Sequence, residues 1–201
     1  MARLSGTEGY AQEAPELLKT YESVPFAEAQ AAALRLIPAT PCRVLDIGAG
    51  TGRDAAGFAA LGHDVVATEP VNEMREGAIA LHPSKSIEWL DDGLPELTRL
   101  RERRDSFDVV MMTAVWMHLD EAQRRRGMPN VASLLRPNGL LVLSLRYGPV
   151  PPGRRMFEVS AEETIALAGA QGLRVVLDEA APTLLKRAQP VTWKRLAFRK
   201  G

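Results

Sequence analysis

Short apolar runs alternate along the chain with longer segments in which apolar residues recur every three or four positions. The runs predict strands, and the longer segments predict the crossover helices between them. Most of the runs are almost entirely apolar, as is typical of strands that helices cover on both faces. The pattern therefore predicts an α/β fold with a doubly wound, mostly parallel sheet. The first five strands are expected at residues 42–47, 63–68, 86–90, 107–112 and 139–145.

Helical patterns and turn signals separate these strands. Crossover helices are expected in the sequences RDAAGFAAL, NEMREGAIAL and EAQRRRGMPNVASLL. Residues 15–36, upstream of the first strand, predict one or two amphipathic helices. Asn138-Gly139 predicts a sharp turn into the fifth strand, and the Pro- and Gly-rich segment 148–155 predicts a loop.

The C-terminal part of the chain predicts one more helix and two closing strands. Ser160, followed three positions later by Glu163, is the pattern of a capping box for a helix that ends near Gly169. The closing strands are expected at 173–180 and 190–198. Because the segment between them is too short for a crossover helix, we expect an antiparallel hairpin.

Length and composition favour a single globular domain. The 201 residues are 46% hydrophobic and 25% charged, which suits one folded unit with a full core. The 25 basic and 25 acidic residues cancel, so the chain lacks the overall positive field of most nucleic-acid-binding proteins. Within this domain we distinguish an N-terminal helical segment or lid (1–40), a central core (42–146) and a substrate-side region with the loop, last helix and hairpin (147–201).

The cysteine content and the apolar runs indicate the compartment. Cys42 is the single cysteine, which excludes an intrachain disulfide and an all-cysteine metal cluster within one chain. The N-terminal residues lack the apolar run of a signal peptide, and no apolar stretch approaches the ~20 residues of a membrane helix. We expect a soluble, cytoplasmic protein without a membrane partner or a metal ion. The oligomeric state cannot be derived from the sequence.

The first predicted strand runs into a glycine-rich turn, VLDIGAGTG at residues 44–52. Gly48, Gly50 and Gly52 permit a tight turn that a ligand can approach closely, next to the unpaired amides of the following helix. Arg53 stands where the GxGxxG fingerprint of dinucleotide-binding proteins has its third glycine, which disfavours a nicotinamide cofactor. We therefore expect a different ligand against the backbone of this turn.

An acidic residue, Glu69, follows the second predicted strand. A carboxylate at this place can accept hydrogen bonds from the two vicinal hydroxyls of a ribose. The same feature occurs with dinucleotide cofactors, so it indicates a nucleoside and does not identify the cofactor.

Residues 43–146 resemble the class I S-adenosylmethionine-dependent methyltransferases. The resemblance rests on the turn GAGTG, on Glu69, on the acid pair Asp91-Asp92 after the third strand, and on the segments FDVVMMTAVWMHL and LLRPNGLLVLSL, which have that family's order and spacing. It implies a seven-stranded sheet with an antiparallel last strand, in agreement with the expected hairpin. It also implies S-adenosyl-L-methionine as cofactor and S-adenosyl-L-homocysteine as product.

The resemblance further implies which residues hold the cofactor. The backbone of residues 113–115 would face its amino-acid part, and either Asp91 or Asp92 would lie near the adenine amino group. Glu69 would hold the ribose, and the methionine portion would be surrounded by Asp46, Gly48, Ala49 and Gly50. Further contacts are expected from Gly52, Arg53, Pro70, Met74, Thr113 and Ala114.

The acceptor side of the site has weaker signals. His118 follows the fourth strand, where a substrate would approach the methyl group; it is either a general base or an anchor for its loop. Trp116 either walls the acceptor pocket or fills the core. Other candidates for acceptor contacts are Tyr10 and Tyr21 in the lid segment, Arg146 and Tyr147 after the fifth strand, and Arg154 and Arg155 in the loop. We interpret the basic runs 101–104 and 124–126 as solvated surface.

The predicted function is transfer of a methyl group from S-adenosylmethionine to an O, N or S atom of a small molecule by in-line SN2 displacement. Orientation supplies much of such catalysis, so an essential base is not required. TAVW stands where amino-directed DNA methyltransferases carry a Pro-Pro tetrapeptide, and no Pro-Cys nucleophile is present, which disfavours nucleic acid as acceptor. The alternatives are a non-catalytic sensor or partner subunit that binds the cofactor, a methyltransferase acting on a macromolecule, and a nicotinamide oxidoreductase.

Overall fold

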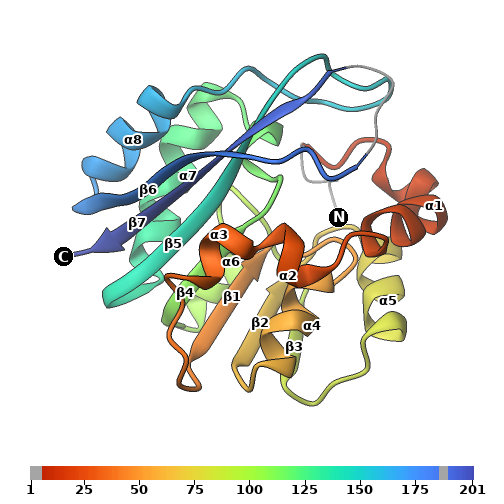
Figure 1. Ribbon diagram of the computed structural model, residues 1–201, viewed down its shortest axis with the longest axis horizontal. Coiled ribbons are helices and arrows are strands. Elements are labelled where there is room, and N and C mark those ends of the chain that lie inside the picture. Colours follow the sequence, from red (N-terminus) through yellow and green to blue (C-terminus); the bar gives the residue numbers. More distant parts are fainter. Residues whose placement is uncertain (1–5, 186–189) are drawn as a thin grey trace.

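The computed structural model describes residues 6–185 and 190–201, whose strands form one seven-stranded sheet (Figure 1). The strands are β1 (Arg43–Ile47), β2 (Asp64–Thr68), β3 (Ile87–Leu90), β4 (Phe107–Met112), β5 (Leu135–Tyr147), β6 (Leu173–Ala181) and β7 (Thr192–Lys200). Their order is β3-β2-β1-β4-β5-β7-β6. The pairs among β1 to β5 are parallel, whereas β7 is antiparallel to both β5 and β6. The predicted fold class, the closing hairpin and the antiparallel last strand are therefore confirmed.

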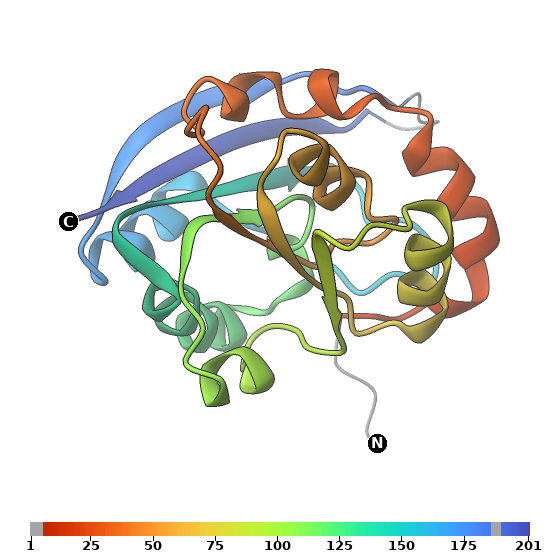
Figure 2. The same ribbon diagram turned by 90° about the horizontal axis from the view of Figure 1, so that it is seen from below.

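Helices cover both faces of the sheet (Figure 2). They are α1 (Tyr10–Glu22), α2 (Phe26–Ala29), α3 (Ala31–Leu34), α4 (Arg53–Ala60), α5 (Asn72–Leu81), α6 (Thr98–Glu102), the 3-10 helix η1 (Trp116–His118), α7 (Glu121–Ser133) and α8 (Ala161–Gly169). Among the described residues, no helix is long and apolar enough to cross a membrane.

Two hydrophobic clusters fill the space between the sheet and its helices. On one face, Phe58 of α4 and Ala33 of α3 pack against alternate residues of the central strands. On the other face, Leu100 of α6, Met128 of α7 and Ala168 of α8 pack against the intervening strand residues. Because the central strands are covered on both faces, their sequences read as continuous apolar runs.

Strand β5 differs from its expected boundaries. It begins at Leu135, before the expected turn at Asn138-Gly139. Asn138 has a positive φ of 61°, and the pairing of β5 with β4 shifts register between Leu135 and Leu140. The predicted sharp turn is thus an irregularity within the strand, and the prediction of a break before it is wrong.

The N-terminal helices and α6 also differ from the expectation. The helical region starts at Tyr10 and divides into three helices, whereas one or two helices were expected over 15–36. Pro15 stands in the second turn of α1, not at its start. The basic run 101–104 is exposed, as expected. Helix α6, which was not predicted, is short and includes the first two residues of this run. Residues 1–5 of the expected lid and part of the segment between the last two strands lie outside the described residues.

The second basic run, 124–126, is only partly surface. Arg124 is buried and donates hydrogen bonds to the carbonyl of Leu119 (2.6 Å) and to both carboxylate oxygens of Glu163 (3.0 and 2.9 Å). This ion pair links α7 to α8. Ser160 caps α8 as predicted, since its hydroxyl accepts a hydrogen bond from the Glu163 amide (3.0 Å), but the Glu163 side chain is engaged by Arg124 instead of the reciprocal capping bond.

Candidate functional site

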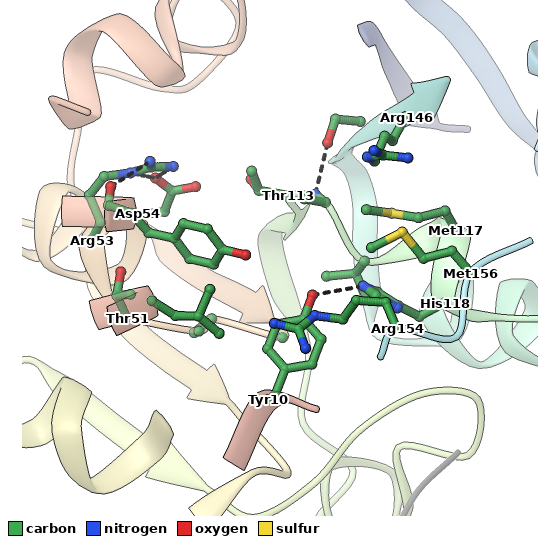
Figure 3. Close-up of a pocket in the computed structure, with 18 of the residues that line it drawn as sticks. Tyr10, Thr51, Arg53, Asp54, Thr113, Met117, His118, Arg146, Arg154 and Met156 are labelled. Carbon is green, nitrogen blue, oxygen red and sulfur yellow. Dashed lines mark hydrogen bonds and ion pairs between the residues drawn. The ribbon is translucent and has the colours of Figure 1, made fainter. Parts of the chain in front are cut away.

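A cavity of about 440 Å³ opens at the carboxyl ends of the parallel strands. It lies beside β1 and β4, where the strand order reverses, which is the usual ligand site of open α/β sheets. Helix α1 and the loop after β5 complete its walls (Figure 3). Its volume is within the ordinary range of ligand pockets, ~300 to 1,000 Å³.

The glycine turn forms one wall of this cavity. Gly50 has a φ of 58°, and a Cβ atom added there would meet only Met74 Cε at 4.0 Å, so the turn is open to a ligand. Gly52 serves packing instead. Its φ is 82°, and an added Cβ would lie 2.9 Å from Trp89 Cη2. Gly52 does not line the cavity, and Met74 is buried behind the turn.

Asp46 is a buried carboxylate at the floor of the cavity. Its oxygen Oδ2 has no hydrogen-bond partner among the described residues. Burial raises the pKa of Asp46 well above its usual range, and the neighbouring Asp54 raises it further. A buried acceptor without a donor is costly, so this position favours a ligand that brings a donor or a positive charge.

Glu69 connects the end of β2 to the glycine turn. Its carboxylate accepts hydrogen bonds from the amides of Gly50 (2.9 Å) and Val71 (2.8 Å). Burial raises the pKa of Glu69 to about 7, even though both amide bonds oppose that shift. The side chain lines the cavity and is poised to gain or lose a proton near neutral pH.

A polar cluster at the start of α4 contains two predicted residues, Arg53 and Thr113, and two that the sequence interpretation missed, Asp54 and Gln30. Asp54 accepts hydrogen bonds from Arg53 Nε (2.8 Å) and from Gln30 Nε2, which also donates to Thr113 Oγ1 (3.0 Å). Gln30 Oε1 is buried without a partner among the described residues. These residues come from separate elements, and only the acidic first turn of α4 was visible in the sequence as a signal.

His118 is held on both sides of its ring. Its Nδ1 lies 2.9 Å from the carbonyl oxygen of Arg155, which can only accept, so Nδ1 carries the proton. Its Nε2 therefore accepts from the Tyr10 hydroxyl, 3.0 Å away (Figure 3). Burial lowers the pKa of His118 and raises that of Tyr10, which favours this neutral pair.

Arg154 fastens α1 over the cavity. Its guanidinium donates to both carboxylate oxygens of Glu13 (2.9 and 2.8 Å) and stacks over the Tyr10 ring at 4.2 Å from the centroid. Met117, Met156 and Arg146 line the cavity beside it (Figure 3).

Several expected site residues lie elsewhere. Trp116 is fully buried in the main core, and Tyr147 packs against that core; neither lines the cavity.

The acid pair expected near the adenine also lies outside the cavity wall. Asp92 uses both carboxylate oxygens to accept hydrogen bonds from the amides of Gly93 (2.9 Å) and Leu100 (3.0 Å), so its carboxylate is part of the turn before α6. Asp91 lies 3.6 Å from Arg75 and is also absent from the cavity wall.

The structure brings the remaining predicted residues together around one space. Cavity-lining residues that the sequence singled out are Tyr10, Tyr21, Asp46, Gly48, Ala49, Gly50, Arg53, Glu69, Pro70, Thr113, Ala114, His118, Arg146 and Arg154. Lining residues that it missed include Thr51, Asp54, Met117, Ser144, Met156 and Arg195.

Comparison with known proteins agrees with this geometry. A family model described as a methyltransferase domain matches residues 44–139. An uncharacterized methyltransferase of Mycobacterium tuberculosis strain H37Rv is 39% identical over 108 residues, which are 54% of this chain and 41% of that protein. The matched part is therefore less than half the length of this relative.

Solved structures share the fold over almost the whole chain. The N-methyltransferase NodS of Bradyrhizobium japonicum, in complex with S-adenosyl-L-homocysteine, has a TM-score of 0.73 at 19% identity and covers 94% of this chain and 97% of its own. The 1,6-didemethyltoxoflavin-N1-methyltransferase of Burkholderia thailandensis, bound to 1,6-didemethyltoxoflavin and S-adenosylhomocysteine, has a TM-score of 0.70 at 20% identity and covers 94% and 87%.

Proposed function

We propose that the protein is a class I S-adenosylmethionine-dependent methyltransferase that transfers a methyl group from S-adenosylmethionine to a small-molecule nucleophile, and the methyltransferase-domain model that matches residues 44–139 supports this. The observation that carries the proposal is one cavity that joins the open turn at Gly50, the buried Glu69 and the unpaired oxygen of Asp46.

The residues of the glycine turn fit this cofactor. Asp46 offers an unpaired, buried acceptor that suits the ammonium or sulfonium charge. Glu69 follows β2 and lines the cavity, where its carboxylate would accept from ribose hydroxyls, and Gly50 leaves room for the cofactor chain. When bound, S-adenosylmethionine supplies a methyl group made electrophilic by a positively charged sulfur.

A small acceptor suits the dimensions of the cavity. Helix α1 and the loop after β5 wall it in, so the acceptor would share a limited volume with the cofactor. The Burkholderia neighbour, whose solved structure contains bound 1,6-didemethyltoxoflavin and S-adenosylhomocysteine, gives the same indication. The walls would orient the nucleophile toward the methyl group and exclude water.

His118 is proposed as the proton acceptor for the reaction. Its Nε2 faces the Tyr10 hydroxyl, so a proton leaving the acceptor would pass to the Tyr10 oxygen while the Tyr10 proton moves to Nε2. The neutral state of His118, which burial favours, leaves Nε2 free to take that proton.

Labelled cofactor tests the proposal directly. The protein is incubated with S-adenosylmethionine carrying an isotopic methyl group and with a fractionated extract of small metabolites, and the extract is analysed by mass spectrometry. We expect a labelled metabolite with the wild type and none with Asp46→Ala. Bound cofactor without any labelled product would favour the sensor or partner-subunit alternative, and labelled nucleic acid or protein would favour a macromolecular acceptor.

A further inference from the structure

Ionisable side chains divide by charge between the two ends of the cavity. Asp46, Asp54 and Glu69 line the end formed by β1, β2 and α4. Arg146, Arg154 and Arg195 line the end formed by β5, β7 and the loop after β5. One residue of the opposite charge lies at each end. At the acidic end Arg53 forms an ion pair with Asp54, and at the arginine end Glu13 forms an ion pair with Arg154.

Arg146 and Arg195 lie on the same face of the sheet. In the antiparallel register, Ser144 is opposite Arg195 and Arg146 is opposite Trp193. Directly opposite residues share a face, and so do alternate residues of one strand, so the two arginines are diagonal neighbours. Both are buried, with 7% and 6% of their surface exposed.

The two guanidinium groups are held by backbone carbonyls. Arg146 donates to the carbonyls of Gly148 (3.1 Å) and Pro149 (2.8 Å), which fix its orientation. Arg195 donates from Nη2 to the carbonyl of Ala29 (2.9 Å). Its Nη1 is buried, and within residues 6–185 and 190–201 no hydrogen-bond partner meets it.

A buried cation is costly unless an anion or strong acceptors compensate it. Burial lowers the pKa of Arg195, although the charge of the nearby Asp54 opposes that shift and the charge of Arg53 adds to it. The sulfur of the cofactor is itself positive, and its one anionic group, the carboxylate of the amino-acid part, is expected beside the backbone of residues 113–115. An anionic group on the acceptor would offset both the arginine charges and the sulfonium charge.

The wall beside Arg146 is apolar. Met117 of η1 and Met156 of the loop lie together below Arg146 (Figure 3). The Phe157 amide donates to the Met117 carbonyl (2.8 Å), which joins the loop to η1. Thioether side chains are polarizable and contact aromatic rings favourably.

We propose that the methyl acceptor carries an anionic group, a carboxylate or a phosphate, that Arg146 and Arg195 bind, with an apolar ring against Met117 and Met156. The proposal rests on the methyltransferase function proposed above, and it specifies the acceptor class for that same cavity. In such a molecule the acidic group would contact the two arginines, and the flat apolar ring would pack against the two methionines.

Three probes that differ in charge test this proposal by titration calorimetry on the protein saturated with S-adenosyl-L-homocysteine. They are 4-hydroxybenzoate, its neutral amide 4-hydroxybenzamide, and 4-hydroxyphenyl phosphate. We expect one or both anions to bind at least about tenfold more tightly than the amide, since hydrogen bonds to charged groups contribute this much. Whichever anion binds more tightly identifies the carboxylate or the phosphate as the favoured group.

Variants assign the preference to the two arginines. Arg146→Met and Arg195→Met should each remove the preference for the anion and leave the affinity for S-adenosyl-L-homocysteine unchanged. Arg125→Met, at an exposed arginine of α7, is the matched control and should change neither affinity. Circular dichroism verifies that each variant folds. If a variant does not fold, the relative affinities of the wild-type protein for the anions and the amide still test the proposal.

Three outcomes would overturn the proposal. The amide could bind the wild type as tightly as both anions, the preference could persist in both variants, or a folded variant could lose S-adenosyl-L-homocysteine, which would assign that arginine to the cofactor. Failure of the wild type to bind S-adenosyl-L-homocysteine at all would instead contradict the methyltransferase function.

Discussion

Glu69 is a buried acid whose protonation we expect to be linked to cofactor binding. Its pKa of about 7 lies above the ordinary value because burial disfavours the charged form. The folded state therefore binds its proton more tightly than the unfolded state, and the contribution of this group to stability declines as pH rises from about 4.5 to about 7. Ribose hydroxyls donate to the charged form, so cofactor binding should release this proton.

From this linkage we predict that affinity for S-adenosyl-L-homocysteine rises about tenfold between about pH 6 and about pH 8. Calorimetry in buffers of different ionisation enthalpy would measure the proton released. Glu69→Gln should bind weakly and without this pH dependence, whereas Glu73→Gln, at an exposed position on α5, should behave like the wild type. An equal pH dependence in Glu69→Gln would show that another group is responsible.

Gly50 allows a direct test of ligand approach to the turn. Gly50 and Gly62 both have positive φ, 58° and 89°, so alanine at either position should cost about 1 to 2 kcal/mol of stability. Neither Cβ would clash, because the nearest heavy atom is 4.0 Å away at Gly50 and none lies within 4 Å at Gly62. We predict that only Gly50→Ala weakens S-adenosyl-L-homocysteine binding in calorimetry. Equal affinities for the two variants would mean that the ligand does not contact Gly50.

The pair of Tyr10 and His118 predicts a change in rate without a change in cofactor affinity. His118→Ala and Tyr10→Phe each break the proposed proton path, so each should lower turnover by about a hundredfold or more. Affinity for S-adenosyl-L-homocysteine should stay nearly the same, because the other end of the cavity is intact. Turnover at the wild-type level in both variants would exclude the base role and leave His118 as an anchor for its loop.

Residues of the site differ in how far the sequence could predict them. Asp46, Gly50 and Glu69 were identified because they are adjacent to the ends of two predicted strands, where local pattern determines position. Gln30 and Arg195 were missed because their places depend on packing between distant elements. Trp116 was ambiguous because the direction of a side chain after a strand depends on the 3-10 helix η1, which the sequence did not reveal.

At the scale of elements, the caps of α7 and α8 illustrate how a local pattern and a tertiary contact compete. Asp120 and Gln123 form a complete capping box on α7, with bonds of 2.8 and 2.9 Å. On α8 the Ser160 hydroxyl accepts its amide bond, but the Glu163 side chain pairs with Arg124. The sequence predicted the start of α8 correctly because Ser160 alone determines it.

Removal of the α8 cap should lower stability and leave the site unchanged. Ser160→Ala loses the bond from the Glu163 amide, which is worth about 1 kcal/mol. Ser133→Ala, at an exposed serine of α7 whose hydroxyl donates to the local Asn130 carbonyl, should have little effect. Urea unfolding would measure the difference, and an equal loss in both variants would contradict the capping role.

The order and type of most elements followed from the sequence, whereas some boundaries did not. Apolar runs located β1 to β5 because parallel strands are buried on both faces. The bulge within β5 and the division of the first helices into α1, α2 and α3 depend on contacts with β4, α4 and α5, which no local pattern records.

At the scale of the whole molecule, the sheet determines where chemistry occurs. The reversal of strand order at β1 and β4 leaves a crevice at the carboxyl edge, and α1 and the loop after β5 close it. Apart from Arg53 and Glu13, acidic residues line one end of that crevice and arginines line the other. On the function proposed above, the acidic end would hold the positively charged cofactor, and the arginine end would hold the anionic acceptor.

The most direct measurement is a calorimetric titration of the purified wild-type protein with S-adenosyl-L-methionine and with S-adenosyl-L-homocysteine. We predict saturable binding of both, one molecule per chain, with loss of binding in Asp46→Ala and no loss in Glu73→Gln. Absence of binding by a folded wild-type protein, or binding that Asp46→Ala leaves unchanged, would contradict the account of this cavity as a cofactor site.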